Sequence, residues 1–207
     1  MKPPSKRQVS GHTLTVWRDE RAAQLAEFAV ALPLLVFFVV GIFDFSGAFT
    51  LKQKLTNVAR DAARAAAGGP ANDLQFPSTT APASVADAFQ LIDNYFKANN
   101  LNDCGITIGG STTLTWTFTA AGNGCPSAGL TITINRGYYI PSTGAALPPV
   151  ECNSPSSAGA NGVTAIVTCV SIRYPYSWRF GRVANLLGMT DTLPARISAT
   201  AVALNEN

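Results

Sequence analysis

The sequence has few of the residues on which most enzymes and nucleic-acid-binding proteins depend. Its 207 residues include a single histidine, His12, and only 13% of them are charged. GxSxG, HExxH and Walker GxxxxGKS/T motifs are missing, and no GxGxxG follows a predicted strand. The net charge is only +3, and no run of basic residues is interleaved with aromatic ones. We therefore expect no enzymatic activity, no cofactor and no nucleic-acid partner.

Residues 25–45 form a long hydrophobic run. Glu27 and Asp44 lie near its two ends, and no charged residue lies between them. About 20 helical residues cross the roughly 30 Å hydrocarbon core of a bilayer, so this run is long enough to span a membrane. Pro33 would cost a water-exposed helix about 3 kcal/mol, whereas neighbouring helices satisfy the freed carbonyl group in a membrane. The run therefore predicts a membrane-spanning helix.

Two other interpretations of this run stay open. A secretory signal peptide would be cut at the small-x-small sequence Ser46-Gly47-Ala48, but both its basic segment and its apolar stretch would be longer than usual. A buried core helix is the second alternative, although globular helices are rarely apolar on all sides over such a length.

All four cysteines lie downstream of the hydrophobic run, and His12 lies upstream of it. No two form a CxxC pair, so two structural disulfides are expected rather than a metal site. Three pairings are open, and Cys104–Cys125 with Cys152–Cys169 is only the most local of them. Disulfides indicate an oxidising compartment, and the positive-inside rule slightly favours a cytoplasmic N-terminus. The part after the run is therefore expected to be exported.

The exported part offers no histidine as a general base. Its carboxylates are scattered among polar neighbours, so solvated or capping roles are expected, although a pair could still meet in space and form an enzyme site. They are Asp61, Asp73, Asp87, Asp93, Asp103, Glu151, Asp191 and Glu206.

Helical spacing continues beyond the membrane run. Leu51, Leu55, Val58, Ala62 and Ala66 recur at intervals of three and four residues, and Gly68-Gly69-Pro70 is a stop signal. One long helix is predicted over residues 23–67. A second is predicted over residues 84–100, with Ser84 as its cap and an apolar face of Val85, Phe89, Ile92 and Phe96.

Four later segments alternate apolar residues with Thr or Ser, the period-two pattern of half-buried strands. They are residues 113–119, 130–136, 163–174 and 196–204. An antiparallel sheet with one face covered by helix predicts an α+β fold. The expected organisation is a cytoplasmic leader (1–22), a transmembrane helix (23–48), a helix extension (49–69), a linker (70–83) and an exported α+β domain (84–207).

Four short segments follow one another near the N-terminus: Glu27-Phe28, Leu32-Pro33-Leu34, Gly41 to Phe45 and Asn57 to Arg64. Residues 163–206 combine a strand, a Tyr-Pro-aromatic turn, a Leu-Leu-Gly segment and a last Ala-Thr strand. In these motifs, both ends of the chain resemble the TadE-like family, the pseudopilins or minor pilins of tight-adherence (Flp-type) pilus systems. Residues 70–162 match no family that we can name.

The resemblance implies a role for Glu27. Prepilin-type peptidases cut five residues before such a glutamate, which places the cut between Ala22 and Ala23. The carboxylate would then pair with the N-terminal amine of a neighbouring subunit inside the bilayer. The residue before the cut is normally Gly and is Ala22 here, so both a processed protein and an uncut anchor stay open.

The resemblance further implies a single-pass protein of the bacterial inner membrane, with its C-terminal domain in the periplasm or in the pilus. Its partners would be other pilus or pseudopilin subunits, the Tad secretion machinery and a prepilin peptidase. The main alternative is a membrane-anchored adhesin or binding protein of the cell envelope that is unrelated to pilus assembly.

Overall fold

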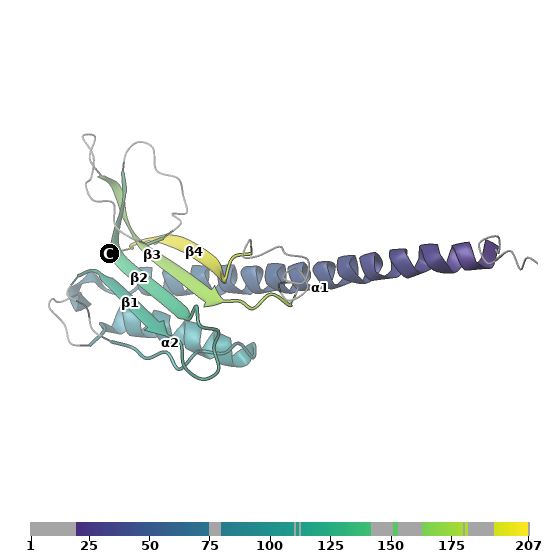
Figure 1. Cartoon of the computed structure of the whole chain (residues 1–207). Helices are drawn as coiled ribbons and strands as arrows, with labels where there is room; N and C mark the ends of the chain where they lie inside the picture. Colours follow the sequence, from purple (N-terminus) through teal and green to yellow (C-terminus); the bar gives the residue numbers. More distant parts are fainter. Residues whose placement is uncertain are drawn as a thin grey trace, which may run out of the picture. The chain divides into compact units, whose positions relative to one another are not determined.

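A computed structural model describes residues 20–74, 80–109, 111, 113–141, 151–152, 163–179, 181 and 193–206. The chain divides into two compact units, Met1–Ile42 and Phe43–Asn207. Its long first helix, α1, and a second helix, α2, accompany a four-stranded antiparallel sheet, so the predicted α+β class is confirmed (Figure 1). The elements are α1 (Glu20–Ala67), the 3-10 helix η1 (Ala71–Asp73), α2 (Ala83–Ala98), β1 (Thr115–Ala120), β2 (Leu130–Pro141), β3 (Val163–Pro175) and β4 (Arg196–Leu204).

In the first unit, the described residues belong to α1. Their side chains from residue 23 onward are exposed or half-buried, and large apolar ones such as Leu25, Phe28 and Val30 are 62–73% exposed. The helix continues through Pro33. By length and composition, α1 is able to cross a membrane.

In the second unit, α1 changes from an apolar helix to an amphipathic one. The predicted stripe from Leu51 to Ala66 is buried, whereas Asn57, Asp61 and Arg64 on the other side are exposed. The Gly68 amide donates to the Arg64 carbonyl (3.0 Å) and the Gly69 amide to that of Ala66 (3.2 Å), which closes the helix at the predicted stop signal.

The sheet has the order β1-β2-β3-β4, and each strand pairs antiparallel with the next. One face carries the alternate apolar residues, which pack in a single core with the stripe of α1 and the predicted apolar face of α2. The members from the strands are Trp116, Phe118, Leu130, Ile132, Ile134, Val170, Ile172, Ala199 and Ala201. The four predicted strands are thus confirmed, with β2 extending further than expected.

The opposite face of the sheet carries hydroxyl groups in register across all four strands. Thr117 lies opposite Thr133, which lies beside Ser171 and then Thr200. The outer pairs are within hydrogen-bonding distance, at 3.5 Å for Thr117 and Thr133 and 3.3 Å for Ser171 and Thr200. Such cross-strand pairs stabilise a sheet without charged groups.

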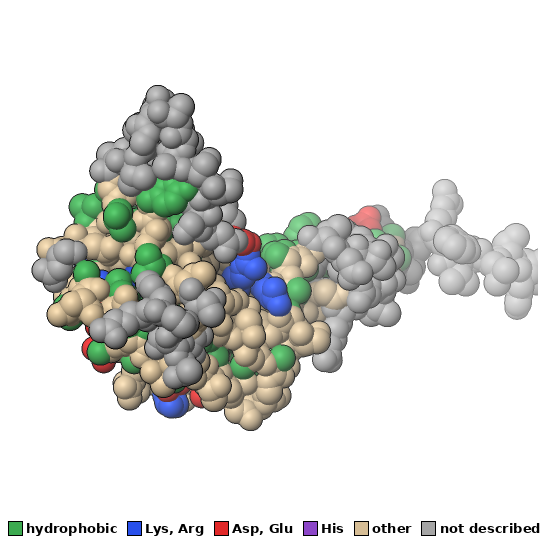
Figure 2. Space-filling model, turned by 90° about the vertical axis from the view of Figure 1, so that its left-hand side faces the viewer, with side chains coloured by type: hydrophobic (Ala, Val, Ile, Leu, Met, Phe, Trp, Pro, Cys, Tyr) green, Lys and Arg blue, Asp and Glu red, His purple; other side chains and the backbone are tan. Residues whose placement is uncertain are grey.

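Charged side chains are few on the surface. Between Cys104 and Ile172 the sequence carries only Arg136 and Glu151, and Arg136 is buried in the structure. Glu151 forms an ion pair with Arg173. Figure 2 accordingly shows few blue or red side chains on the face that it draws in colour.

The predicted capping role of Ser84 is wrong. Helix α2 begins at Ala83 after Pro82, and Ser84 is buried within its first turn. The backbone amide of Ser84 instead donates to the Asp73 carboxylate, 2.9 Å away. A side chain that is distant in sequence therefore supplies the acceptor that the local pattern suggested Ser84 would supply.

Candidate functional site

The residues of the predicted processing site lie on the first turns of α1. Ala23, Glu27 and Phe28 are exposed, and residue 22 lies in the same helix. Ala23 and Glu27 are four residues apart and so share one face of the helix. Residues 1–19 of the predicted leader (1–22) lie outside the described residues, and the structure does not test the cut.

Asp44, the acidic residue at the other end of the hydrophobic run, is buried rather than exposed. It is 5% exposed, and the Tyr176 hydroxyl lies 3.2 Å from both its carboxylate Oδ1 and its backbone oxygen. Tyr176 directly follows β3, 132 residues further along the chain. Gly47 allows this approach, because a Cβ atom there would lie only 3.1 Å from the Tyr176 hydroxyl.

The environment of Tyr176 favours its neutral form. Burial raises the pKa of the Tyr176 phenol, and the nearby Asp44 charge and hydrogen bond raise it further, while Arg179 partly opposes the shift. A neutral hydroxyl is the form that donates to a carboxylate.

Two further aromatic side chains, Trp178 and Phe45, pack next to this contact. Trp178 packs against Tyr176 with ring centroids 4.9 Å apart and against Phe45 of α1 at 5.2 Å. The indole N–H donates to the Pro194 carbonyl oxygen at 2.7 Å. We call Phe45, Tyr176 and Trp178 the junction cluster. The sequence did not reveal this contact, although the Tyr-Pro-Tyr-Ser-Trp segment that begins at the end of β3 was an aromatic signal for it.

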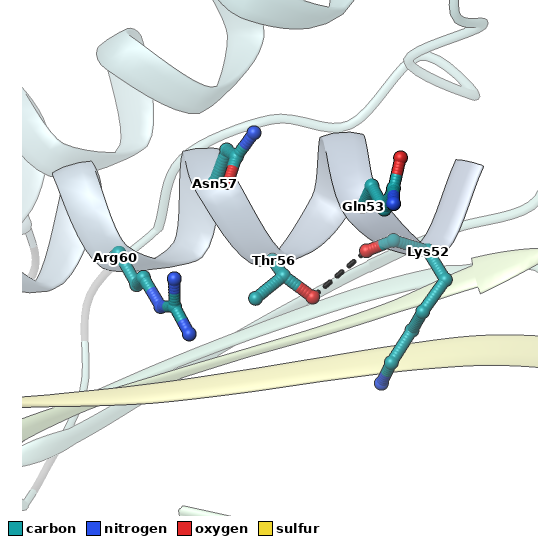
Figure 3. Close-up of a pocket in the computed structure, with 5 residues that line it drawn as sticks. All are labelled: Lys52, Gln53, Thr56, Asn57 and Arg60. Atoms are coloured by element: carbon teal, nitrogen blue, oxygen red, sulfur yellow. Dashed lines mark hydrogen bonds between the residues drawn. The ribbon is translucent and has the colours of Figure 1, made fainter. Parts of the chain in front are cut away.

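A shallow polar groove follows the exposed side of α1. Lys52, Gln53, Thr56, Asn57 and Arg60 line it, and its volume is about 350 Å³ (Figure 3). The Thr56 hydroxyl donates to the Lys52 carbonyl at 2.8 Å, and the Lys52 ammonium group donates to the Ser198 carbonyl of β4. The groove carries positive charge, and none of its described lining residues is a carboxylate or a histidine.

A buried cation lies at the C-terminal end of α1. Arg136 of β2 is 2% exposed and donates to the Gly69 carbonyl at 2.9 Å. Burial lowers its pKa, and the Asp73 charge partly opposes this. A positive charge is stabilised at the negative, C-terminal end of the helix dipole, which indicates a structural role for Arg136.

The four cysteines form the two predicted disulfides, in the most local of the three possible pairings. Cys104 is bonded to Cys125 and Cys152 to Cys169, with Cα atoms 5.4 Å apart in each pair. The first lies in the main core, and the second joins Cys152 to Cys169 of β3. Among the described residues, no cluster of His, Cys, Asp or Glu side chains is suited to hold a metal ion.

The structure thus defines a class of protein: an α+β domain with two disulfides whose first helix extends into an apolar segment able to cross a membrane. Residues 22–64, which form most of α1, match the model of the family described as TadE-like protein. The predicted TadE-like family is confirmed on this segment, and it implies membrane anchoring and a role associated with a Tad pilus. No curated protein and no solved structure matches the chain.

Proposed function

We propose that this chain is a pseudopilin-like or membrane-anchored component of Tad/Flp-type pilus assembly that acts by helix packing and protein–protein contact. The observation that carries the proposal is the position of the family match, which covers α1 from before Glu27 to Arg64. In the first unit, the described side chains of this helix from residue 23 onward are exposed or half-buried. Its surface is thus available to lipid and to the helices of other subunits.

Glu27 is the proposed contact residue within the membrane. Cutting after Ala22 would create a new amine on Ala23, one helical turn from Glu27 on the same face. A carboxylate and an ammonium group from neighbouring subunits lower one another's cost in hydrocarbon. The partners are therefore other pilus or pseudopilin subunits, with a prepilin peptidase making the cut and the Tad machinery driving assembly.

The proposed orientation has the N-terminus in the cytoplasm and the domain outside it, at the inner membrane. Two disulfides in the domain support this, because disulfides persist in oxidising compartments. Catalysis forms no part of the proposal.

The N-terminus and the intact mass of the protein from its native membranes test this account. A start at Ala23 supports peptidase processing, whereas a start near Met1 means an uncut anchor that assembles through its exported domain. A start at Phe49 would indicate a signal peptide and would refute the proposed role of Glu27.

A deletion strain separates pilus assembly from the adhesin alternative. Loss of pili, restored by the wild-type chain but not by Glu27→Gln, supports the proposal. The matched control is Asp61→Asn, which changes an exposed carboxylate further along the same helix and should restore pili. Normal pili with reduced attachment would instead favour a membrane-anchored adhesin.

A further inference from the structure

We propose that the junction cluster is a membrane-interface site, which seats the domain on the headgroup layer of the bilayer that α1 crosses. This inference rests on the proposed membrane anchoring and names lipid as the partner of one surface of the domain. The polar ends of the cluster are already bonded inside the protein, while Phe45 is exposed and the rings of Tyr176 and Trp178 are half-buried.

Exposure along α1 changes where its lipid-facing part ends. Ile42 and Phe43 are 67% and 75% exposed, whereas Asp44 is 5% and Ala48 is 8% exposed. From Asp44 onward, one side of the helix is therefore covered by the domain. The other side remains apolar, because Phe45 and Phe49 are 54% and 64% exposed and lie one turn apart.

The polar groups of the junction cluster form hydrogen bonds within the protein. The Trp178 N–H donates to the Pro194 carbonyl, and the Tyr176 hydroxyl bonds to Asp44. These groups need no further partner, so the surrounding ring surface can leave water without an unsatisfied hydrogen bond. Tyr and Trp are enriched at this depth of membranes.

A positive charge lies next to the junction cluster in the sequence. Arg179 directly follows Trp178 and is exposed. A guanidinium group beside aromatic rings matches the lipid phosphates, which lie just outside the apolar layer. Lipid phosphate explains the exposed cation beside the apolar rings. A protein helix as partner explains that cation less well.

Fluorescence quenching in liposomes tests the proposal with the full chain. The W17F variant retains Trp116, which is fully buried, and Trp178, which is half-buried. The matched control is W17F/W178F, which retains only Trp116. Each variant is reconstituted with phosphatidylcholine that is brominated either close to the headgroup or close to the chain end.

We expect the lipid brominated close to the headgroup to quench W17F more strongly than the lipid brominated close to the chain end. W17F/W178F should lose most of this quenching. Equal and weak quenching of the two variants in vesicles that carry the protein through a flotation gradient would overturn the interface site but leave membrane anchoring intact. Failure of W17F to float with the vesicles would refute the membrane anchoring itself and this inference with it. Near-UV circular dichroism identifies misfolding. W17F/F45S, which retains both Trp116 and Trp178, then serves as the second variant and should weaken headgroup-region quenching.

Discussion

Replacing Tyr176 by Phe should destabilise the domain by removing one hydroxyl group and little else. The ring contact with Trp178 is kept, while the hydrogen bond to buried Asp44 is lost. Hydrogen bonds to charged groups contribute about 1.5–3 kcal/mol. The 3.2 Å separation is longer than the usual range of about 2.5–3.0 Å for an O–H donor, so a value at or below the lower end is expected. We expect a loss of about 1–2 kcal/mol in the free energy of unfolding.

Urea denaturation of the full chain in a non-ionic detergent measures this loss. With a slope of about 2 kcal/mol per M of urea, the midpoint should fall by roughly 0.5–1 M. Tyr95→Phe is the matched control, because Tyr95 is also half-buried and its hydroxyl has no hydrogen bond among the described residues. Equal midpoints for the two variants would refute the reasoning, since the contact with Asp44 would then contribute nothing measurable.

Three further predictions concern the core, the disulfides and pH. Leu55→Ala removes a fully buried side chain and should lower the free energy of unfolding by about 2–5 kcal/mol in the same assay. Replacing either cysteine pair by Ala should cost about 3 kcal/mol, because the closed loops are of similar length, with separations of 21 and 17 residues. Burial raises the pKa of both Tyr174 and Tyr176, so their contribution to stability is present below about pH 10 and is lost as the pH rises through the folded-state pKa. A titration of the denaturation midpoint from neutral to alkaline pH measures this loss.

Each of these predictions has a matched comparison. Gln53→Ala changes an exposed position of the same helix and should stay within about 0.5 kcal/mol of wild type, and a similar value for Leu55→Ala would contradict the assignment of the core. Peptide mapping without reduction should recover the two local cysteine pairs, and any crossed pair would disprove the connectivity. Tyr176→Phe should lose less stability than wild type between neutral and alkaline pH, and an unchanged slope would exclude a contribution from Tyr176.

Periodicity predicted the elements well because burial dictates it. The spacing from Leu51 to Ala66 reflects the one side of α1 that meets the core, and Thr-apolar alternation reflects a sheet with one covered face. Contacts between distant segments left no such signal. The pattern at Ser84 was compatible with a cap, but Asp73 supplies the acceptor from eleven residues away. The burial of Arg136 likewise depends on the position of Gly69, which no local pattern specifies.

The burial of Asp44 also bears on the glutamate at the start of the helix. If the lipid-facing segment begins at Ala23 and ends at Phe43, it has 43 − 23 + 1 = 21 residues, and about 1.5 Å per residue gives about 32 Å, close to the thickness of a bilayer core. Glu27 lies 44 − 27 = 17 residues before Asp44, or about 25 Å measured along the helix. It would then lie roughly 5 Å inside the hydrocarbon, where a lone carboxylate is unfavourable. Asp44 meets the same requirement at the other boundary through Tyr176, from its own chain. Glu27 has no such partner among the described residues of its chain, which supports the proposed pairing with an ammonium group of another subunit.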